Sequence, residues 1–246
     1  MKIYSLLAAG RYHPLHGEDY QYYQYLGERW FVAAVMDGCS SGKESYFAST
    51  FYGKSLRKSC RMLPNMKSIS EDFDIEFMDK EAIGSFILGQ LFEDIKKLKN
   101  TLFLDIEEIL STILLLVYDV KERSAWINTS GDGIIVCDDF IEEIDQQNIP
   151  DYLGYHLDIK FDKWYQQHTN TYNFNQIKDI SISTDGVAKI KPNTLIKSAP
   201  LDPVDYFLVQ PPEGPPERAL YSKYMGMVEN HRYIAYDDIS IIRIIP

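Results

Sequence analysis

Four apolar, strand-like runs each carry an aspartate at one end. They read FVAAVMDG at 31–38, AWINTSGDGIIV at 125–136, ISISTDGV at 180–187 and YDDISIIRII at 236–245. If the ends of these strands converge, the carboxylates form one cluster, and clustered carboxylates raise each other's pKa unless cations compensate. A cluster of oxygen ligands selects hard ions such as Mg²⁺ or Mn²⁺. The pattern therefore indicates a metal-dependent hydrolase.

Each of these aspartates also has an ordinary structural explanation. Asp37-Gly38 and Asp185-Gly186 could be plain turns, and Asp237-Asp238 could cap a strand. Gly131-Asp132-Gly133 lies between two strand-like runs, as a hairpin turn does. The turn explanation must hold separately at every site, whereas one metal site explains the set. We therefore favour the metal site, with Asp37 as its strongest single candidate.

Charge and cysteine content exclude several classes of protein. The 246-residue chain has a net charge of −11, which argues against binding to nucleic acid or anionic membranes, because both require a basic surface. No run approaches the roughly 20 apolar residues of a membrane span. The start MKIYSLLAAG is expected to be a strand rather than a secretory signal. Cys39, Cys60 and Cys137 lack a CxxC pair, which predicts free thiols in a reducing, cytoplasmic environment.

The order of predicted elements indicates an α+β fold. Early strands form a hairpin through Gly27-Glu28, two helices follow, and β-branched runs fill much of the rest. The expected strands cover 2–9, 20–26, 30–36, 110–119, 123–129, 133–138, 179–184 and 238–245. The expected helices are KESYFASTFYGKSLRKSCRML, ending at Pro64, then 81–99 and 217–226, with a short one near 151–157.

These elements predict a specific architecture. The runs between 110 and 138 suggest an antiparallel meander, and two strand groups around the helices suggest two packed sheets with helices outside. No linker or internal repeat divides the chain, so 1–246 is expected to be a single domain. The segment 188–235 is rich in proline and is expected to be an irregular, flap-like insertion over the acidic edge.

In order and spacing, the acidic segments resemble those of the metal-dependent Ser/Thr protein phosphatases, the PPM or type 2C family. The family's Asn/Met-Glu-Asp element is similar to Gly17-Glu18-Asp19, and its strand ending in Asp-Gly before a turn and helix is similar to VMDGCSSGKESYFAS. Its other motifs are similar to LSTILLLVYD, SGDG, STDGV and Asp237-Asp238-Ile239-Ser240. The resemblance covers about residues 3 to 245. It implies a central β-sandwich of two mainly antiparallel sheets flanked by helices, α-β-β-α.

The resemblance also implies metal ligands and a reaction. Asp37 would bridge two Mn²⁺ or Mg²⁺ ions, the Gly38 carbonyl would bind one of them, and Asp185 and Asp237 would complete the other. Two cations lower the pKa of a bridging water and neutralise phosphoryl oxygens. The implied activity is hydrolysis of phosphoserine or phosphothreonine in a protein substrate by attack of that water, without a covalent intermediate.

The acidic pair Glu18 and Asp19 would orient metal-bound water, although as a sequence feature the pair also fits a polar turn. Family members usually carry an arginine just before this pair, where it binds substrate phosphate. Here Arg11 lies several residues early, in GRYHPLHGED. Arg11, His13 and His16 are the candidates to replace it.

Other positions depart from the family pattern. Lys189 stands where a second aspartate usually follows Ser-Asp-Gly, which argues against a third ion bound through Asp132. Cys39 replaces a histidine or methionine and is expected to be a packed thiol rather than a nucleophile. Ser40-Ser41 replaces a common Gly-Gly pair. The sequence therefore predicts a two-metal centre with an unusual periphery.

Three functions remain open at this point. The leading one is a metal-dependent phosphoprotein phosphatase. The alternative is a catalytically weak or inactive pseudophosphatase that binds a phosphoprotein or partner, which the missing arginine and the atypical turn favour. A metal-stabilised structural domain ranks last. The oligomeric state is not determined by the sequence, and a monomer is the default expectation.

Overall fold

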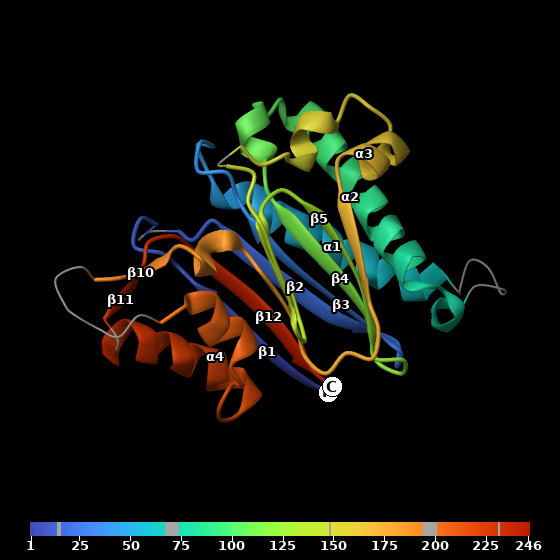
Figure 1. Cartoon of the computed structure of the whole chain (residues 1–246). Helices are drawn as coiled ribbons and strands as arrows, with labels where there is room; N and C mark the ends of the chain where they lie inside the picture. The colour runs from blue at the N-terminus through green and yellow to red at the C-terminus, as the bar shows by residue number, and fades with distance from the viewer. Residues whose placement is uncertain (14–15, 67–73, 148, 194–200, 231) are drawn as a thin grey trace.

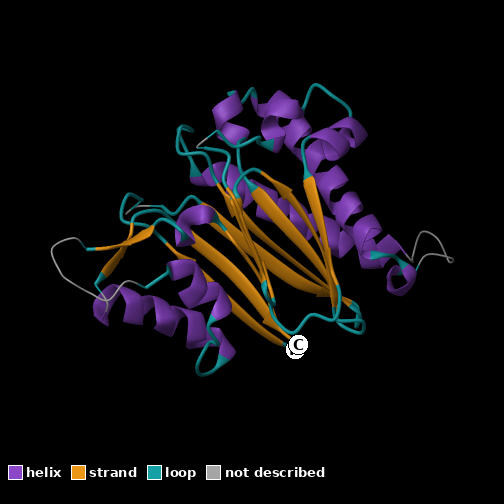
Figure 2. Ribbon diagram, viewed as in Figure 1, coloured by secondary structure: helices purple, strands orange, loops and turns teal. Residues whose placement is uncertain are grey.

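Strands that are buried along nearly their whole length, such as β3 (Trp30–Asp37) and β4 (Ile113–Asp119), form two stacked sheets. The computed structural model describes residues 1–13, 16–66, 74–147, 149–193, 201–230 and 232–246. Two five-stranded antiparallel sheets lie face to face, and helices cover the outer faces (Figures 1 and 2). The predicted fold class, an α-β-β-α sandwich, is confirmed.

Both sheets draw strands from separate parts of the chain. The first has the order β2-β3-β4-β5-β8 and the second the order β1-β12-β9-β6-β7. The strands of the first sheet are β2 (Asp19–Leu26), β3 (Trp30–Asp37), β4 (Ile113–Asp119), β5 (Ser124–Ser130) and β8 (Asn170–Phe174). Those of the second are β1 (Lys2–Ala8), β6 (Gly133–Cys137), β7 (Phe140–Ile144), β9 (Ile180–Ser183) and β12 (Ile239–Ile245). A separate pair joins β10 (Ile190–Pro192) to β11 (Tyr233–Ala235).

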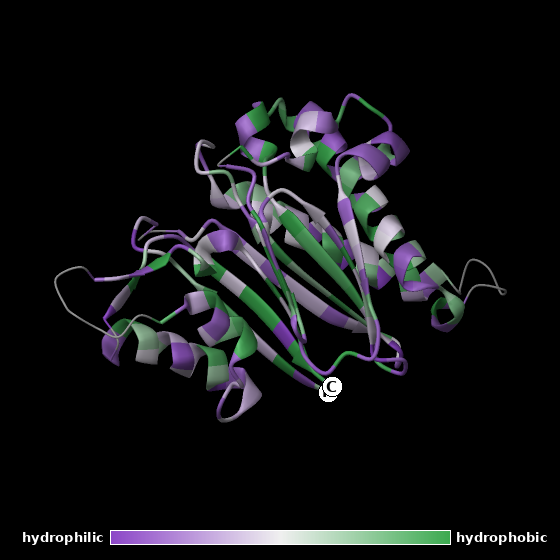
Figure 3. Ribbon diagram, viewed as in Figure 1, coloured by the Kyte–Doolittle hydropathy of each residue, from purple (hydrophilic) through white to green (hydrophobic). Residues whose placement is uncertain are grey.

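Strand β3 is apolar at almost every position because both of its faces are buried. Trp30, Val32 and the alternate residues after them pack into the core beneath the helices. Phe31, Ala33 and Val35 point the other way, into the core between the sheets. A strand buried on both faces needs no polar alternation. Figure 3 shows the hydrophobic character that continues along the neighbouring strand β4.

Two long helices cover the first sheet. They are α1 (Tyr46–Asn65) and α2 (Lys80–Leu102), and their apolar faces share one core with the strands beneath. The Asp79 side chain accepts a hydrogen bond from the Ala82 amide at 2.7 Å and caps α2 at its start. Helix α1 ends at Asn65, one residue past the predicted end at Pro64. Pro64 therefore lies within the last turn of the helix and does not terminate it. Among the described residues, no helix combines the length and apolarity needed to cross a membrane.

The outer face of the second sheet is covered by part of the 188–235 segment. Helix α4 (Pro216–Met225) confirms the helix predicted at 217–226, and its Leu220 is fully buried. The π-helical turn Asp205–Val209 buries Phe207 in the same core. This part of the segment forms a helix layer, and the flap-like role expected for 188–235 stays a prediction. Residues 194–200 and 231 of the predicted flap lie outside the described residues.

A buried arginine fastens this layer to the sheet. Arg243 of β12 is 1% exposed and forms two hydrogen bonds with the Asp179 carboxylate, at 2.9 and 2.6 Å. It also donates to the carbonyls of Phe207, Val209 and Gln210. A buried guanidinium with all these partners satisfies backbone groups that a π-helical turn leaves open.

The predicted meander between 110 and 138 is wrong in its last step. Strands β4 and β5 pair as expected, but β6 crosses to the second sheet and lies between β9 and β7. The short apolar run of β6 gives its extended conformation but not its partner. The sequence does not predict strands β7 and β8 or helix α3 (Phe161–Gln167), since 139–178 lacks clear periodicity. The short helix expected near 151–157 is present at Leu153–His156.

Replacing Arg243 tests this attachment. Arg243→Met leaves Asp179 and three carbonyls without their donor, so we expect the free energy of unfolding to fall by about 3–5 kcal/mol. Lys121→Met removes only the exposed pair with Glu76 at 3.2 Å and should cost about 0–1 kcal/mol. Urea unfolding of both variants checks the prediction. Equal, small effects would contradict it.

Candidate metal centre

The strand ends bring the predicted metal ligands to one place. Asp37 ends β3, Asp185 follows β9, Asp237 precedes β12, and Asp132 lies between β5 and β6. Their backbones meet because β9 pairs with the starts of both β12 and β6, while β4 joins the ends of β3 and β5. All four aspartates, with Gly38, line one pocket at this end of the sandwich.

The backbone around Asp37 is held on both sides. The Asp37 amide donates to Thr112 Oγ1 at 3.0 Å, and the Thr112 amide donates to the Asp37 carbonyl at 2.8 Å. The Gly38 amide donates to the Glu18 carbonyl at 3.1 Å. A Cβ at Gly38 would overlap the Ser45 carbonyl, so only glycine fits here. These contacts fix the backbone of Asp37, whose side chain lines the pocket.

Gly186 allows two acidic segments to touch. A Cβ at this position would overlap the Asp238 carbonyl oxygen. The turn that carries Asp185 therefore packs directly against the segment 237–238. This close approach explains why an Asp-Gly sequence follows β9, and it places Asp185 beside Asp237.

Lys189 lies between these two carboxylates. Its Nζ is 2.9 Å from Asp185 Oδ2 and 2.7 Å from Asp237 Oδ2. Burial acts to lower the pKa of Lys189, but the hydrogen bond to Asp237 and the charge of Asp185 raise it above the ordinary value. The spacing of four residues from Asp185 is the sequence signal for one of these contacts. From the sequence, Lys189 is interpreted only as a missing acidic ligand.

The donor set fits divalent cations. It consists of carboxylates and a backbone carbonyl, the oxygen ligands that Mg²⁺ and Mn²⁺ prefer. Asp185 Oδ1 is buried and has no hydrogen-bond partner among the described residues, so it is free to bind a cation. Burial raises the pKa of Asp37, and the nearby charges of Asp185 and Asp237 raise it further. One ammonium group does not balance these acids.

Glu18 and Asp19 lie behind the pocket rather than in its lining. Asp19 is opposite Asp37 in the β2–β3 ladder, and its Oδ2 accepts a hydrogen bond from Thr184 Oγ1 at 2.6 Å. Burial raises the pKa of Asp19 well above its usual range, and the charge of Asp37 adds to the shift. Glu18 Oε2 accepts a hydrogen bond from Ser40 Oγ at 2.6 Å, which links it to the turn after β3.

Asp238 has a structural role that the sequence does not reveal. Its carboxylate accepts hydrogen bonds from the amides of Gly10 and Glu18 and contacts His13 Nδ1 at 3.1 Å. His13 Nε2 also lies 3.4 Å from Glu18 Oε1. Asp238 therefore ties the chain after β1 to the start of β12, directly next to Asp237.

The candidates for binding substrate phosphate lie elsewhere. Arg11 is exposed and does not line the pocket, and His16 is exposed, with its ring tilted against that of Tyr46 at a centroid distance of 4.9 Å. Their proposed role remains a prediction. Asp132 does line the pocket, but its Oδ1 already accepts the Gln146 amide at 2.9 Å. Cys39 lines the pocket as well, with its Sγ 3.0 Å from Ser41 Oγ.

A separate histidine cluster forms around Asp151, which lies in the chain between the pocket residues Pro150 and Tyr152. Asp151 contacts His156 Nε2 at 2.5 Å and His168 Nδ1 at 2.8 Å, and the two imidazole rings stack at 3.7 Å. These donor atoms lie within 4.8 Å of one another, and no other group of three in the described part of the chain is as compact. One nitrogen of each ring contacts the Asp151 carboxylate, and none of these three residues lines the acidic pocket. The pocket acids are spread around Lys189 instead.

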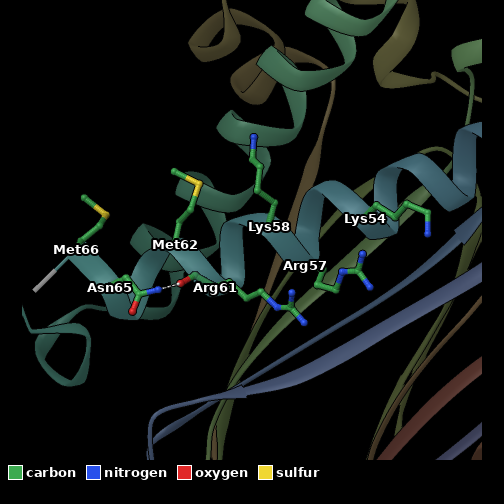
Figure 4. A pocket seen from close by; sticks show the side chains of 7 residues that line it. All are labelled: Lys54, Arg57, Lys58, Arg61, Met62, Asn65 and Met66. Atoms are coloured by element: carbon green, nitrogen blue, oxygen red, sulfur yellow. Dashed lines mark hydrogen bonds between the residues drawn. The ribbon is translucent and has the colours of Figure 1, made fainter. Parts of the chain in front are cut away.

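A basic groove runs along α1, away from the acidic pocket. Figure 4 shows its lining residues, Lys54, Arg57, Lys58, Arg61, Met62, Asn65 and Met66. Lys58 pairs with Asp94, whereas the other cations point from one exposed helix face. Within the described part of the chain the groove lining contains no carboxylate or nucleophile, and we interpret it as a solvated helix face.

The raised pKa of Asp19 predicts a specific pH dependence. The unfolded carboxyl ionises near pH 4, whereas the folded one keeps its proton to higher pH. The stability contributed by this proton is therefore present at low pH and lost as pH rises through the folded pKa. The variant Asp19→Asn has no carboxyl group to ionise, so it avoids this loss of stability, and its side-chain oxygen can still accept the hydrogen bond from Thr184. Without divalent cations, the melting temperature of the variant relative to wild type should rise as the pH increases above about 4. Parallel curves would contradict this.

Comparison with known proteins places the chain in a family. The sequence profile of the family described as Protein phosphatase 2C matches residues 10–219. No curated protein sequence matches the chain significantly. A bacterial serine phosphatase of known structure is 15% identical, with a TM-score of 0.67 over 99% of this chain and 96% of that one.

Two further solved structures have related folds. The serine/threonine phosphatase Stp1 from Staphylococcus aureus is 15% identical, with a TM-score of 0.61 over 100% of this chain and 95% of its own. RsbX in complex with magnesium is 14% identical, with a TM-score of 0.52 over 98% and 92%. At these identities the structures support the fold alone, whereas the profile covers most of the sequence. The chain belongs to the Protein phosphatase 2C family.

Proposed function

We propose that this chain is a metal-dependent phosphatase of phosphoserine or phosphothreonine in proteins. The observation that carries the proposal is the convergence of Asp37, Gly38, Asp185 and Asp237 on one pocket. Family membership and the bacterial serine phosphatases of similar fold support the same reaction. RsbX, whose structure contains magnesium, supports a divalent-ion requirement.

The proposed ligands divide between two ions, Mn²⁺ or Mg²⁺. Asp37 would contact both, Gly38 would contribute its carbonyl to one, and Asp185 and Asp237 would hold the other. When bound, the ions supply positive charge that activates water and neutralises phosphoryl oxygens. The overall reaction consumes one water: the ester P–O bond breaks, and the products are the free hydroxyl group and inorganic phosphate.

The surrounding residues set the geometry for this chemistry. Asp19 and Glu18, held by Thr184 and Ser40, keep acceptor oxygens behind Asp37, where they can orient water. Thr112 fixes the backbone of Asp37. Preorganised positions matter because small displacements of reacting groups cost large factors in rate.

The mouth of the pocket is suited to a protein segment. Ile149, Tyr152 and Tyr155 form one wall, and Tyr155 is 50% exposed. On the other side, Tyr12, Tyr236 and Lys191 line an adjoining hollow next to Asp237. We place substrate selection on these surfaces and on the 188–235 segment that begins beside them. Three free cysteines fit a reducing compartment, and we place the protein in the cytoplasm.

Binding without turnover is the second candidate function. Lys189 neutralises two of the proposed ligands, and no arginine lines the pocket among the described residues. Both features would suit a pseudophosphatase that recognises a phosphorylated partner. The retained carboxylates and the unpartnered Asp185 Oδ1 favour the enzyme.

Hydrolysis of an aryl phosphate tests the proposal. Wild type should require Mn²⁺ or Mg²⁺ and lose activity with a chelator. Asp37→Asn should lower kcat/KM by about 100-fold or more, since even the groups behind metal ligands typically contribute about 10–100-fold.

Asp139→Asn is the matched control, because it removes the same charge from an exposed turn. It should retain wild-type activity. A wild-type protein that is inert at saturating Mn²⁺ yet binds a phosphoserine peptide would establish the pseudophosphatase. An Asp37→Asn variant as active as wild type would exclude the proposed centre.

A further inference from the structure

Lys189 contacts two of the carboxylates that the proposed metal centre would use. Its Nζ lies 2.7 Å from Asp237 Oδ2 and 2.9 Å from Asp185 Oδ2, and its side chain is 40% exposed. Both acids come from segments that the Gly186 contact presses together. One ammonium therefore spans two carboxylates from different parts of the chain.

The local backbone holds Lys189 in this position. The Ala188 amide donates to the Asp185 carbonyl at 2.9 Å, and the Lys189 amide donates to the Gly186 carbonyl at 3.2 Å. This turn returns the chain over its own start, so the lysine side chain reaches back to Asp185. Strand β10 begins at the next residue and fixes the exit of the turn.

A cation that enters the same site must compete with this ammonium. Oxygens that share their charge with Lys189 attract a second cation less strongly, and the two positive charges repel each other at short range. The lysine is flexible and partly exposed, so it can leave toward solvent when its ion pairs break. The geometry therefore couples ion binding to a movement of one side chain.

We propose that Lys189 is a tethered competitor for the ion held by Asp185 and Asp237. This inference rests on the proposed two-ion centre. The ammonium neutralises these acids in the metal-free protein and turns outward when a divalent cation binds them. The site consequently requires a higher concentration of divalent cation than the same carboxylates would without the lysine.

The variant Lys189→Met tests the inference. Its affinity for Mn²⁺ is measured by isothermal titration calorimetry and compared with that of wild type. Loss of two ion pairs that compete with the metal should tighten Mn²⁺ binding by about tenfold or more. Lys191→Met is the control for net charge, since Lys191 lies nearby and lines the same adjoining hollow. It should change Mn²⁺ affinity by less than about twofold, because among the described residues Lys189, and not Lys191, forms the ion pairs with Asp185 and Asp237. Lys189→Arg retains the charge and should bind Mn²⁺ as weakly as wild type.

Acetylation of the wild-type protein gives a test that needs no variant. Saturating Mg²⁺ should raise the labelling of Lys189 relative to Lys191 in the same molecule, measured by mass spectrometry. Unchanged or weaker Mn²⁺ binding by Lys189→Met, or Lys189 labelling that does not rise with Mg²⁺, would overturn the inference.

These outcomes are separate from the fate of the proposed function. If Lys189→Met binds Mn²⁺ more tightly than wild type but neither protein hydrolyses the aryl phosphate, the inference about Lys189 stands and the proposed phosphatase activity fails. If wild type hydrolyses the aryl phosphate but wild type and Lys189→Met bind Mn²⁺ equally well, the phosphatase activity stands and the inference about Lys189 fails.

Discussion

Repulsion among carboxylates at the strand ends is the constraint on which the rest of the structure depends. Asp19 and Asp37 face each other across the β2–β3 ladder, and Gly186 allows Asp185 to pack beside Asp237. Burial makes each charge more costly than it would be in water. The fold offsets part of this cost with Lys189 and with a hydrogen bond from Thr184. The part of this electrostatic cost that Lys189 and Thr184 do not offset is the physical reason to expect bound divalent cations.

The hydrophobic cores provide the rigidity that holds these acids together. Strand β3 is buried on both faces, so the position of Asp37 is determined by packing far from the pocket. Strand β12 is fixed in the same way, with Arg243 attaching the outer helix layer to it. Acids carried on such strands cannot separate to relieve their repulsion. Their charge must be neutralised in place, by protons such as the one that Asp19 retains or by a cation from the chain or from solution.

The β-sandwich and the grouping of aspartates at its strand ends could be predicted, because both leave strong local signals in the sequence. The doubly buried strand at 30–36 and the paired Asp-Gly turns are examples. Partner choice is less visible: β6 leaves its neighbour β5 for the other sheet, since a short apolar run fits either. Likewise, the contact of Lys189 with Asp237 joins residues 48 positions apart, and no local pattern encodes it. Asp238 is paired with Asp237 in the sequence motif, yet its carboxylate accepts backbone amides instead.

The central claim is that these carboxylates form a divalent-metal centre in which Lys189 yields to an ion. The most direct measurement is anomalous diffraction from crystals grown with Mn²⁺. We expect manganese peaks among Asp37, Gly38, Asp185 and Asp237, with Lys189 turned away from both of its present partners. A crystal at saturating Mn²⁺ without such peaks, and with Lys189 still paired to Asp185 and Asp237, would contradict the account.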